Sequence, residues 1–262
     1  MDISIAPETV FHLGPLAVSN SMLTAALISL ALIVAGFALR QILRRIPGRL
    51  QSGLELAYEG LEGLATSIVG NADAARDVLP YILTLFVFIL ASNWSGLVPG
   101  FGTLEVAGTH LGKAAEVPLF RAPTSDLNTT IALALISVGY VQYLGLKYAG
   151  FKGYLGRFVS FKNPVAFFVG ILEIIGELAR IISFSFRLFG NIFAGEVLIS
   201  VMLFLTASLL PYVPIIPLPF FFLELFVGVI QAFVFCFLTL LFVSLAVVSH
   251  DAEGHGQPAV AH

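Results

Sequence analysis

The feature that most constrains this chain is an apolar run from Pro164 to Leu210 that carries Arg187 near its middle. As one helix the run would be ~70 Å long at ~1.5 Å per residue, whereas the hydrocarbon core of a bilayer is only ~30 Å thick. We therefore expect a membrane helix that is strongly tilted, bent or both. Arginine stays protonated in proteins, so Arg187 must face protein, water or a counter-charge, and it marks a functional site.

The remainder of the chain is also apolar. Hydrophobic residues make up 58% of the sequence and charged residues only 11%, where a soluble protein carries ~25% charge. We predict an all-α membrane protein that forms a single polytopic domain over residues 1–262. The predicted membrane-spanning helices are 20–41, 78–98, 127–147, 164–210 and 215–249. The first three are expected to stand upright, and the last two to form a long, strongly tilted antiparallel hairpin around the proline-rich segment 211–219.

Four further segments are expected outside the spans. They are an extracytoplasmic tail (1–19), an amphipathic helix (50–70), an outer loop (99–126) and a cytoplasmic tail (250–262). In the second of these, apolar residues repeat at helical spacing, while Glu55, Glu59 and Glu62 lie on other faces. This pattern predicts a helix on the cytoplasmic membrane surface. A helix that packs on other protein fits the same pattern.

The distribution of Lys and Arg predicts the orientation in the membrane. The predicted cytoplasmic segments hold Arg40, Arg44, Arg45, Arg49, Arg76, Lys147, Lys152, Arg157 and Lys162. The predicted outer segments hold only Lys113 and Arg121, and the apolar runs hold Arg180 and Arg187. Because basic residues concentrate on the cytoplasmic side, we expect the N-terminus outside and the C-terminus in the cytoplasm.

The polar residues within the hairpin sort onto two tracks by helical spacing. The first track is one stripe of Glu173, Glu177, Arg180, Arg187 and Asn191. The second comprises Glu196, about 180° around the helix from Arg187, with Glu224 on the partner helix; Gln231 shares the face of Glu224 two turns on. A buried carboxyl group that water reaches suits a proton relay. Two offset tracks with Arg187 between them therefore suggest two half-channels that do not meet.

Structural interpretations remain open for several of these residues. Glu177 and Arg180 fit a neutralising pair, and Glu173 fits an interfacial carboxylate that reaches the headgroups. Asn191 and Gln231 fit hydrogen bonds between helices. Arg187 has no acidic residue three or four positions away on its own helix, so its partner must come from elsewhere, including another subunit.

Other classes of site find little support in the sequence. Cys236 is the single cysteine, and the five histidines lack the spacing of a metal site. We expect no catalytic residue, metal or cofactor, and the absence of a basic run argues against a nucleic-acid partner.

Four segments resemble subunit a of F-type ATP synthases, the membrane stator of the F0 proton channel. The most specific begins Arg187-Leu188-Phe189-Gly190-Asn191 and continues to Ala194-Gly195-Glu196. The others are Glu224 to Phe235, Asn93-x-x-Gly96-Leu97-x-Pro99 and Ser125-Asp126-Leu127-Asn128. Together they extend over most of the chain from the second span onward.

The resemblance implies a non-catalytic subunit that conducts protons to and from the carboxylates of a c-subunit ring. Arg187 would face the ring, drive deprotonation and prevent a direct leak, with Gln231 opposite and Asn191 beside it. Glu196 and Glu224 would line the outer half-channel, with Asp126 near its mouth. Glu173, Glu177 and Arg180 would line the cytoplasmic half-channel.

The resemblance also implies partners and a location. The partners would be the c ring, the b subunits of the peripheral stalk, the remainder of the ATP synthase, and membrane lipid. The location would be a bacterial plasma membrane, with an organellar inner membrane as the alternative. A self-contained ion-coupled secondary transporter is the alternative function, although the chain lacks an inverted repeat. A credible dyad or zinc motif for an intramembrane enzyme is also absent.

Overall fold

The computed structural model of the chain describes most of its length. The described residues are 7–14, 16–43, 47–98, 100, 104–110, 113–150, 154, 164–209 and 216–248. The fold divides into two compact units, each of which is described by itself. Unit 1 comprises Met1–Leu43, Leu85–Leu133 and Ser183–Phe235, and unit 2 comprises Arg44–Thr84, Ala134–Ile182 and Cys236–His262.

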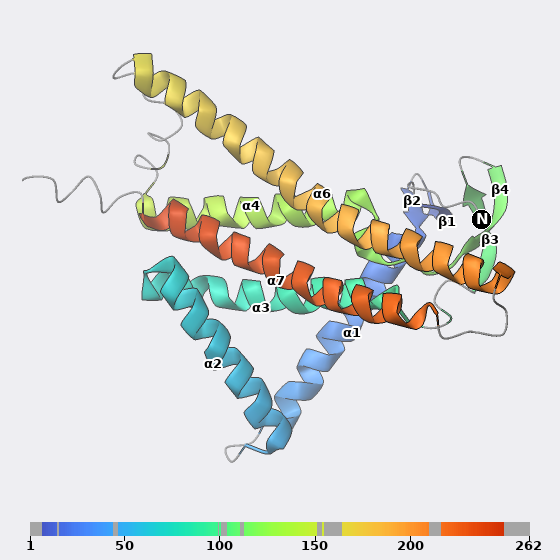
Figure 1. Cartoon of the computed structure of the whole chain (residues 1–262). Coiled ribbons are helices and arrows are strands. Elements are labelled where there is room, and N and C mark those ends of the chain that lie inside the picture. Colours follow the sequence, from blue (N-terminus) through green and yellow to red (C-terminus); the bar gives the residue numbers. More distant parts are fainter. Residues whose placement is uncertain are drawn as a thin grey trace, which may run out of the picture. The chain divides into compact units, whose positions relative to one another are not determined.

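Long helices form most of the described structure (Figure 1). They are α1 (Asn20–Ile42), α2 (Arg49–Val69), α3 (Ala72–Ser95), α4 (Leu127–Ala149), α6 (Pro164–Leu209) and α7 (Leu218–Val248). All except α2 are long and apolar enough to cross a membrane, which gives five candidate spans, as predicted. The protein is therefore a helical, multi-pass membrane protein. The predicted turn between α6 and α7 and the predicted cytoplasmic tail lie largely outside the described residues.

Helix α3 begins six positions before the predicted span at residue 78. The side-chain oxygen of Asn71 accepts hydrogen bonds from the backbone N–H groups of Asp73 (3.0 Å) and Ala74 (3.1 Å). Asn71 therefore caps the helix at a polar segment that hydropathy does not count as membrane. The cap, rather than the start of the apolar run, sets where this helix begins.

Unit 1 also contains a small antiparallel sheet that the sequence analysis did not predict. Its strands are β1 (Thr9–Leu13), β2 (Leu16–Ser19), β3 (Glu105–His110) and β4 (Lys113–Pro118), in the order β2-β1-β3-β4. The predicted tail and outer loop thus pair with each other, through Thr9 opposite Thr109. Short strands that pair across ~100 positions of sequence leave little local signal.

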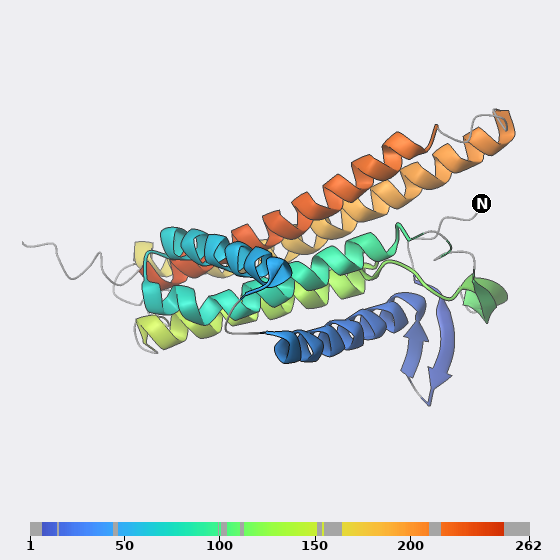
Figure 2. The ribbon, with the colours of Figure 1, turned by 90° about the horizontal axis from the view of Figure 1, so that it is seen from below.

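The first turn of α1 organises the segments around this sheet in unit 1 (Figure 2). The buried amide of Asn20 donates to the Glu8 carboxylate (2.9 Å) and to the Pro118 carbonyl (3.3 Å). One turn on, the hydroxyl of Thr24 accepts a hydrogen bond from the backbone N–H of Arg121 (3.3 Å). The start of α1 therefore fixes both the sheet and the segment that leads into α4.

In unit 2, a polar cluster joins α3 to α4. Lys147 forms an ion pair with the Asp77 carboxylate, which also accepts a hydrogen bond from the Tyr148 hydroxyl (2.6 Å). The hydroxyl of Tyr140 donates to the backbone carbonyl of Asp77 (2.9 Å). These contacts satisfy polar groups at one end of the two helices and fix how they pair.

Helices α6 and α7 contact each other within each unit. The rings of Phe184 and Phe235 lie 4.8 Å apart in unit 1. In unit 2, the guanidinium of Arg180 lies 4.2 Å from the ring of Phe242. Helix α6 is continuous over 46 residues.

The close approach of Tyr154 to α4 gives a stability prediction. A Cβ at Gly145 would lie 2.5 Å from the buried ring of Tyr154, whereas a Cβ at Gly139 on the same helix would have no described neighbour within 4 Å. Gly145→Ala should therefore destabilise the chain by ~1–3 kcal/mol through overpacking. Gly139→Ala should be neutral or stabilising, because alanine favours the helix by ~1 kcal/mol. Thermal unfolding in detergent measures both, and equal midpoints would contradict the packing described here.

Candidate functional site

Arg187 lies on α6 without a counter-charge among the described residues. Its Nη2 donates a hydrogen bond to the hydroxyl of Ser183, one turn earlier, at 3.1 Å. No ion pair of Arg187 with the described part of the chain is found. A partly exposed guanidinium in an apolar helix therefore keeps a charge that its own described surroundings do not neutralise.

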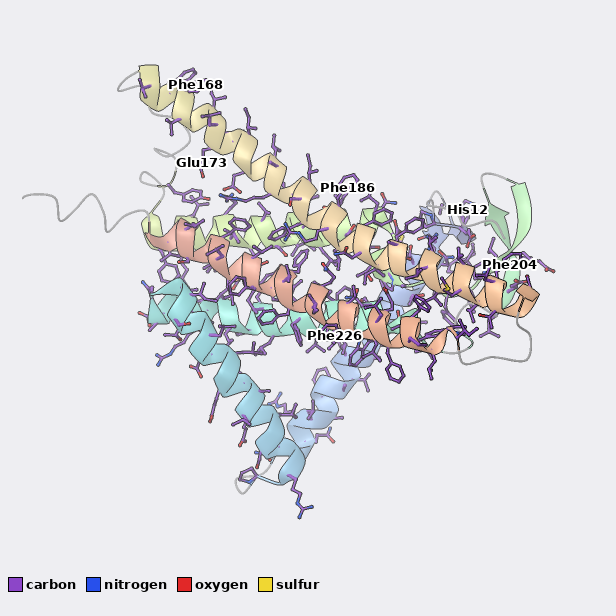
Figure 3. The ribbon with its side chains drawn as sticks, in the orientation of Figure 1. His12, Phe168, Glu173, Phe186, Phe204 and Phe226 are labelled. Carbon is purple, nitrogen blue, oxygen red and sulfur yellow. The ribbon has the colours of Figure 1, made fainter. Side chains whose placement is uncertain are left out.

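The face of α6 that carries Arg187 is turned outward from unit 1. Ser183, Asn191 and Ala194 lie on this side and are exposed, whereas Leu188 and Ile192, about 100° and 140° around the helix from Arg187, are buried. Phe186 and Phe204 of unit 1 lie on another exposed stripe of the same helix, about 100° from Arg187 (Figure 3), and both are more than half exposed. The Arg187 face thus carries small or polar neighbours and is flanked by an exposed apolar stripe.

Glu224 on α7 lies against α6 at Gly195, about 80° around the helix from Arg187. Its residue is 8% exposed, and its carboxylate occupies the space where a Cβ of Gly195 would stand. Glu224 accepts no hydrogen bond from the described part of the chain. The absence of a side chain at Gly195 therefore creates the room in which this carboxyl group sits.

Two side chains at the end of α3 fix the rotation of α7. The amide of Asn93 donates to the carbonyl of Gly228 (2.8 Å), and the indole of Trp94 donates to that of Leu225 (3.1 Å). Both carbonyls lie within one turn of Glu224. The sequence identified Asn93 only as part of a family-like segment and Trp94 only as an interfacial residue. Their partners are backbone atoms of another helix, which no local pattern reveals.

Arg121 is buried in a place that the sequence analysis did not predict. It was counted as a charge of the outer loop, yet it is only 8% exposed. Its Nε donates to the hydroxyl of Ser125 (3.1 Å) and lies 3.9 Å from the Glu196 carboxylate. The signal in the sequence was weak: a single arginine in a segment rich in glycine and proline is typical of a solvated loop.

Asp126, predicted near the outer mouth, accepts hydrogen bonds within unit 1. It is 2% exposed, accepts a hydrogen bond from the Ser21 hydroxyl (2.5 Å) and receives the backbone N–H of Asn128 (2.9 Å). The latter contact caps the start of α4. The geometry gives Asp126 a structural function, and its place in an ion pathway stays a prediction.

Several buried polar atoms of unit 1 have no hydrogen-bond partner in the described chain. They are Ser92 Oγ, Asn93 Oδ1, Thr124 Oγ1 and Glu196 Oε2. Buried groups of this kind bind ordered water when the site has room. The part of unit 1 that holds Glu196 can therefore bind ordered water.

The remaining predicted residues lie in two groups. Asn191 and Gln231 belong to unit 1, with Asn191 exposed and Gln231 half-buried. Glu173, Glu177 and Arg180 belong to unit 2. Arg180 Nη1 lies 2.5 Å from Glu177 Oε1, so the neutralising pair that the sequence allowed is present. The other oxygen of Glu177 is buried and lacks a described partner.

The contact between Gly195 and Glu224 predicts that a larger side chain at position 195 lowers the stability of the chain. Gly195→Ala places a methyl group on the Glu224 carboxylate, so the carboxyl group must move and the chain should lose ~1–3 kcal/mol. Gly176→Ala on the same helix meets no described atom within 4 Å and is the matched control. Thermal unfolding in detergent compares the two. A Gly195→Ala variant as stable as the control would contradict the placement of Glu224.

Comparison with known proteins identifies the same family by a family model and by individual relatives. A family model described as ATP synthase A chain matches residues 20–244. ATP synthase subunit a of Gloeobacter violaceus is 37% identical over 250 residues, which cover 95% of this chain and 92% of the relative. The subunits a of Syntrophobacter fumaroxidans and Moorella thermoacetica are each 33% identical over 246 residues. These matches cover 93% and 94% of this chain, and 90% and 99% of the relatives. The chain therefore belongs to the ATP synthase A chain family, whose curated members bear the name subunit a.

Proposed function

We propose that this chain is the proton-conducting stator subunit of a rotary F-type ATP synthase. Two offset half-channels would deliver protons to, and remove them from, the carboxylates of a c-subunit ring. The observation that carries the proposal is Arg187. It lies on an outward face of α6 and finds no counter-charge in the described chain, within a family-specific segment.

The charge of Arg187 explains how such a stator acts on the ring. A nearby cation favours the ionised form of a carboxyl group, so each ring carboxyl that reaches Arg187 releases its proton. A carboxylate that moves on into lipid must first become neutral, because a charge there is costly. Arginine cannot be deprotonated in its place, so it also blocks a proton path directly between the half-channels. Gln231 would lie opposite as a neutral partner, with Asn191 beside the arginine.

The half-channels are assigned from the two groups of polar residues. Glu196 and Glu224, near the unpartnered buried atoms of unit 1, would form the outer half-channel, with Asp126 close to its mouth. Glu173, Glu177 and Arg180 in unit 2 would line the cytoplasmic one. The Glu177–Arg180 pair neutralises two charges in a long apolar helix and leaves one carboxylate oxygen free to bind water.

The distribution of Lys and Arg and the family of the chain support a proposed membrane, orientation and set of partners. The chain would form one polytopic domain in a bacterial plasma membrane, with the N-terminus outside and the C-terminus in the cytoplasm. Helices α1, α3 and α4 would stand upright, α6 and α7 would be strongly tilted, and α2 would lie on the cytoplasmic surface. The partners would be the c ring, the b subunits and the remainder of the synthase. The chain itself would have no catalytic residue.

Replacement of the arginine tests the proposal. Arg187→Ala should abolish ATP-driven proton pumping by the assembled complex in vesicles, because ring carboxyl groups would no longer be driven to release protons. Ser183→Ala removes the hydrogen bond to Arg187 but keeps its charge, and should retain most of the pumping. Acidification of the vesicle lumen, followed with a fluorescent dye, measures both.

Assembly of each complex is checked by co-purification of the other subunits. Normal pumping by an assembled Arg187→Ala complex would exclude the stator mechanism. Proton transport by the purified chain without a c ring would instead favour a self-contained transporter.

A further inference from the structure

Arg180 contacts two side chains in unit 2, one on its own helix and one on α7. Its Nη1 donates a hydrogen bond to Glu177 Oε1 at 2.5 Å, one turn earlier on α6. Its Cζ lies 4.2 Å from the centroid of the Phe242 ring. The side chains of Arg180 and Glu177 are 21% and 12% exposed, and Phe242 is half-buried. A largely buried guanidinium therefore meets both a carboxyl group and the face of an aromatic ring.

The ring of Phe242 stabilises a positive charge that the side chain cannot lose. Arginine stays protonated in proteins, and a cation in an apolar helix is costly unless other protein groups attend it. The face of an aromatic ring is electronegative, so it attracts a cation within ~6 Å of its centroid, and more strongly where water is excluded. At 4.2 Å, Arg180 lies well inside this range. Phe242 thus supplies an attraction that an aliphatic side chain of similar size would not.

The contact with Phe242 also brings a second helix to the pair. Glu177 and Arg180 are three positions apart on α6, so they are neighbours on one helix and their hydrogen bond restrains no other element. The ring of Phe242 belongs to α7, and it links this part of α6 to α7 within unit 2. A long arginine side chain held at its planar end has few directions left in which to point, so its Nη1 stays beside Glu177.

We propose that Phe242 is a positioning residue of the cytoplasmic half-channel, which holds the guanidinium of Arg180 so that it stays paired with Glu177. The inference rests on the proposed function, because Glu177 and Arg180 are assigned to that half-channel there. Phe242 itself binds no proton and acts only through Arg180. Without the ring, Arg180 is free to turn away from Glu177, whose other oxygen already lacks a partner in the described chain. The polar lining of the half-channel then loses its fixed geometry.

Fluorination of the Phe242 ring tests the contact, because fluorine withdraws negative charge from the ring face and changes the size of the ring little. Phenylalanines that carry one, two and three fluorine atoms are incorporated at position 242 of the full chain. The midpoint of thermal unfolding in detergent should fall with each fluorine, by about 2–4 °C over the series. Apolar packing alone predicts no fall, since a fluorinated ring is at least as apolar. A midpoint that does not change along the series would overturn the proposal.

The same series at Phe226, also on α7, is the matched control (Figure 3). The side chain of Phe226 is 62% exposed, and no cation contacts its ring among the described residues. Its unfolding midpoint should therefore not depend on the number of fluorine atoms. In an Arg180→Met background the series at Phe242 should be flat as well, because the cation is gone. An equal fall at both phenylalanines, or a fall that persists in Arg180→Met, would contradict a cation–π contact.

ATP-driven proton pumping by the assembled complex in vesicles tests what the contact does. The pumping rate should fall by about twofold or more over the Phe242 series and stay unchanged over the Phe226 series. Phe242→Tyr keeps an aromatic face and should retain pumping, whereas Phe242→Leu should lose at least as much as the ring with three fluorine atoms. A fall in the unfolding midpoint without a fall in pumping would limit Phe242 to stability and refute its positioning function.

The outcome is distinguishable from failure of the stator proposal. That proposal is judged by ATP-driven pumping of the Arg187→Ala complex, which does not depend on the ring at position 242. Unchanged pumping over the Phe242 series, together with loss of pumping in Arg187→Ala, would overturn the function of Phe242 but leave the stator in place. The unfolding midpoints report the contact between Arg180 and Phe242 whether or not the chain is a stator.

Discussion

A permanent positive charge in an apolar helix is the constraint on which this structure depends. Arg187 cannot lose its proton, and within the described chain it finds a serine hydroxyl but no anion. The cost of such a charge in hydrocarbon requires water or an anionic partner beside it. A ring of carboxylates that passes the exposed face of α6 would provide that partner. The family to which the chain belongs gives this interpretation its context.

Other contacts of unit 1 position the carboxyl groups of Glu196 on α6 and Glu224 on α7. Asn93 and Trp94 hold α7 by its backbone, and the bare surface at Gly195 admits the carboxylate of Glu224. The first turn of α1 fixes the segment that carries Arg121, and Arg121 in turn reaches Glu196. Buried polar groups are thus either paired with a defined partner or are candidates to bind ordered water.

Local patterns predicted the helices well and the partners of the side chains poorly. The apolar run around Arg187 predicted one long helix, and α6 is continuous from Pro164 to Leu209. Helix α3 begins at Ala72, before the predicted span at residue 78, because Asn71 caps it. The sheet and the burial of Arg121 were missed because both depend on contacts between segments far apart in sequence. Spacing along a helix identifies a face, whereas only the fold shows what that face meets.

Disulfide cross-linking within the assembled complex tests the central claim most directly. Single cysteines at Ser183, Asn191 and Ala194, in a Cys236→Ser background, would be paired with a cysteine scan of the c-subunit helix around its carboxylate. Cysteines at the buried positions Leu188 and Ile192 are the matched controls. The account predicts cross-links to c from the exposed positions alone, with rotation blocked. Cross-links from the buried positions, or none from a complex that assembles, would contradict it.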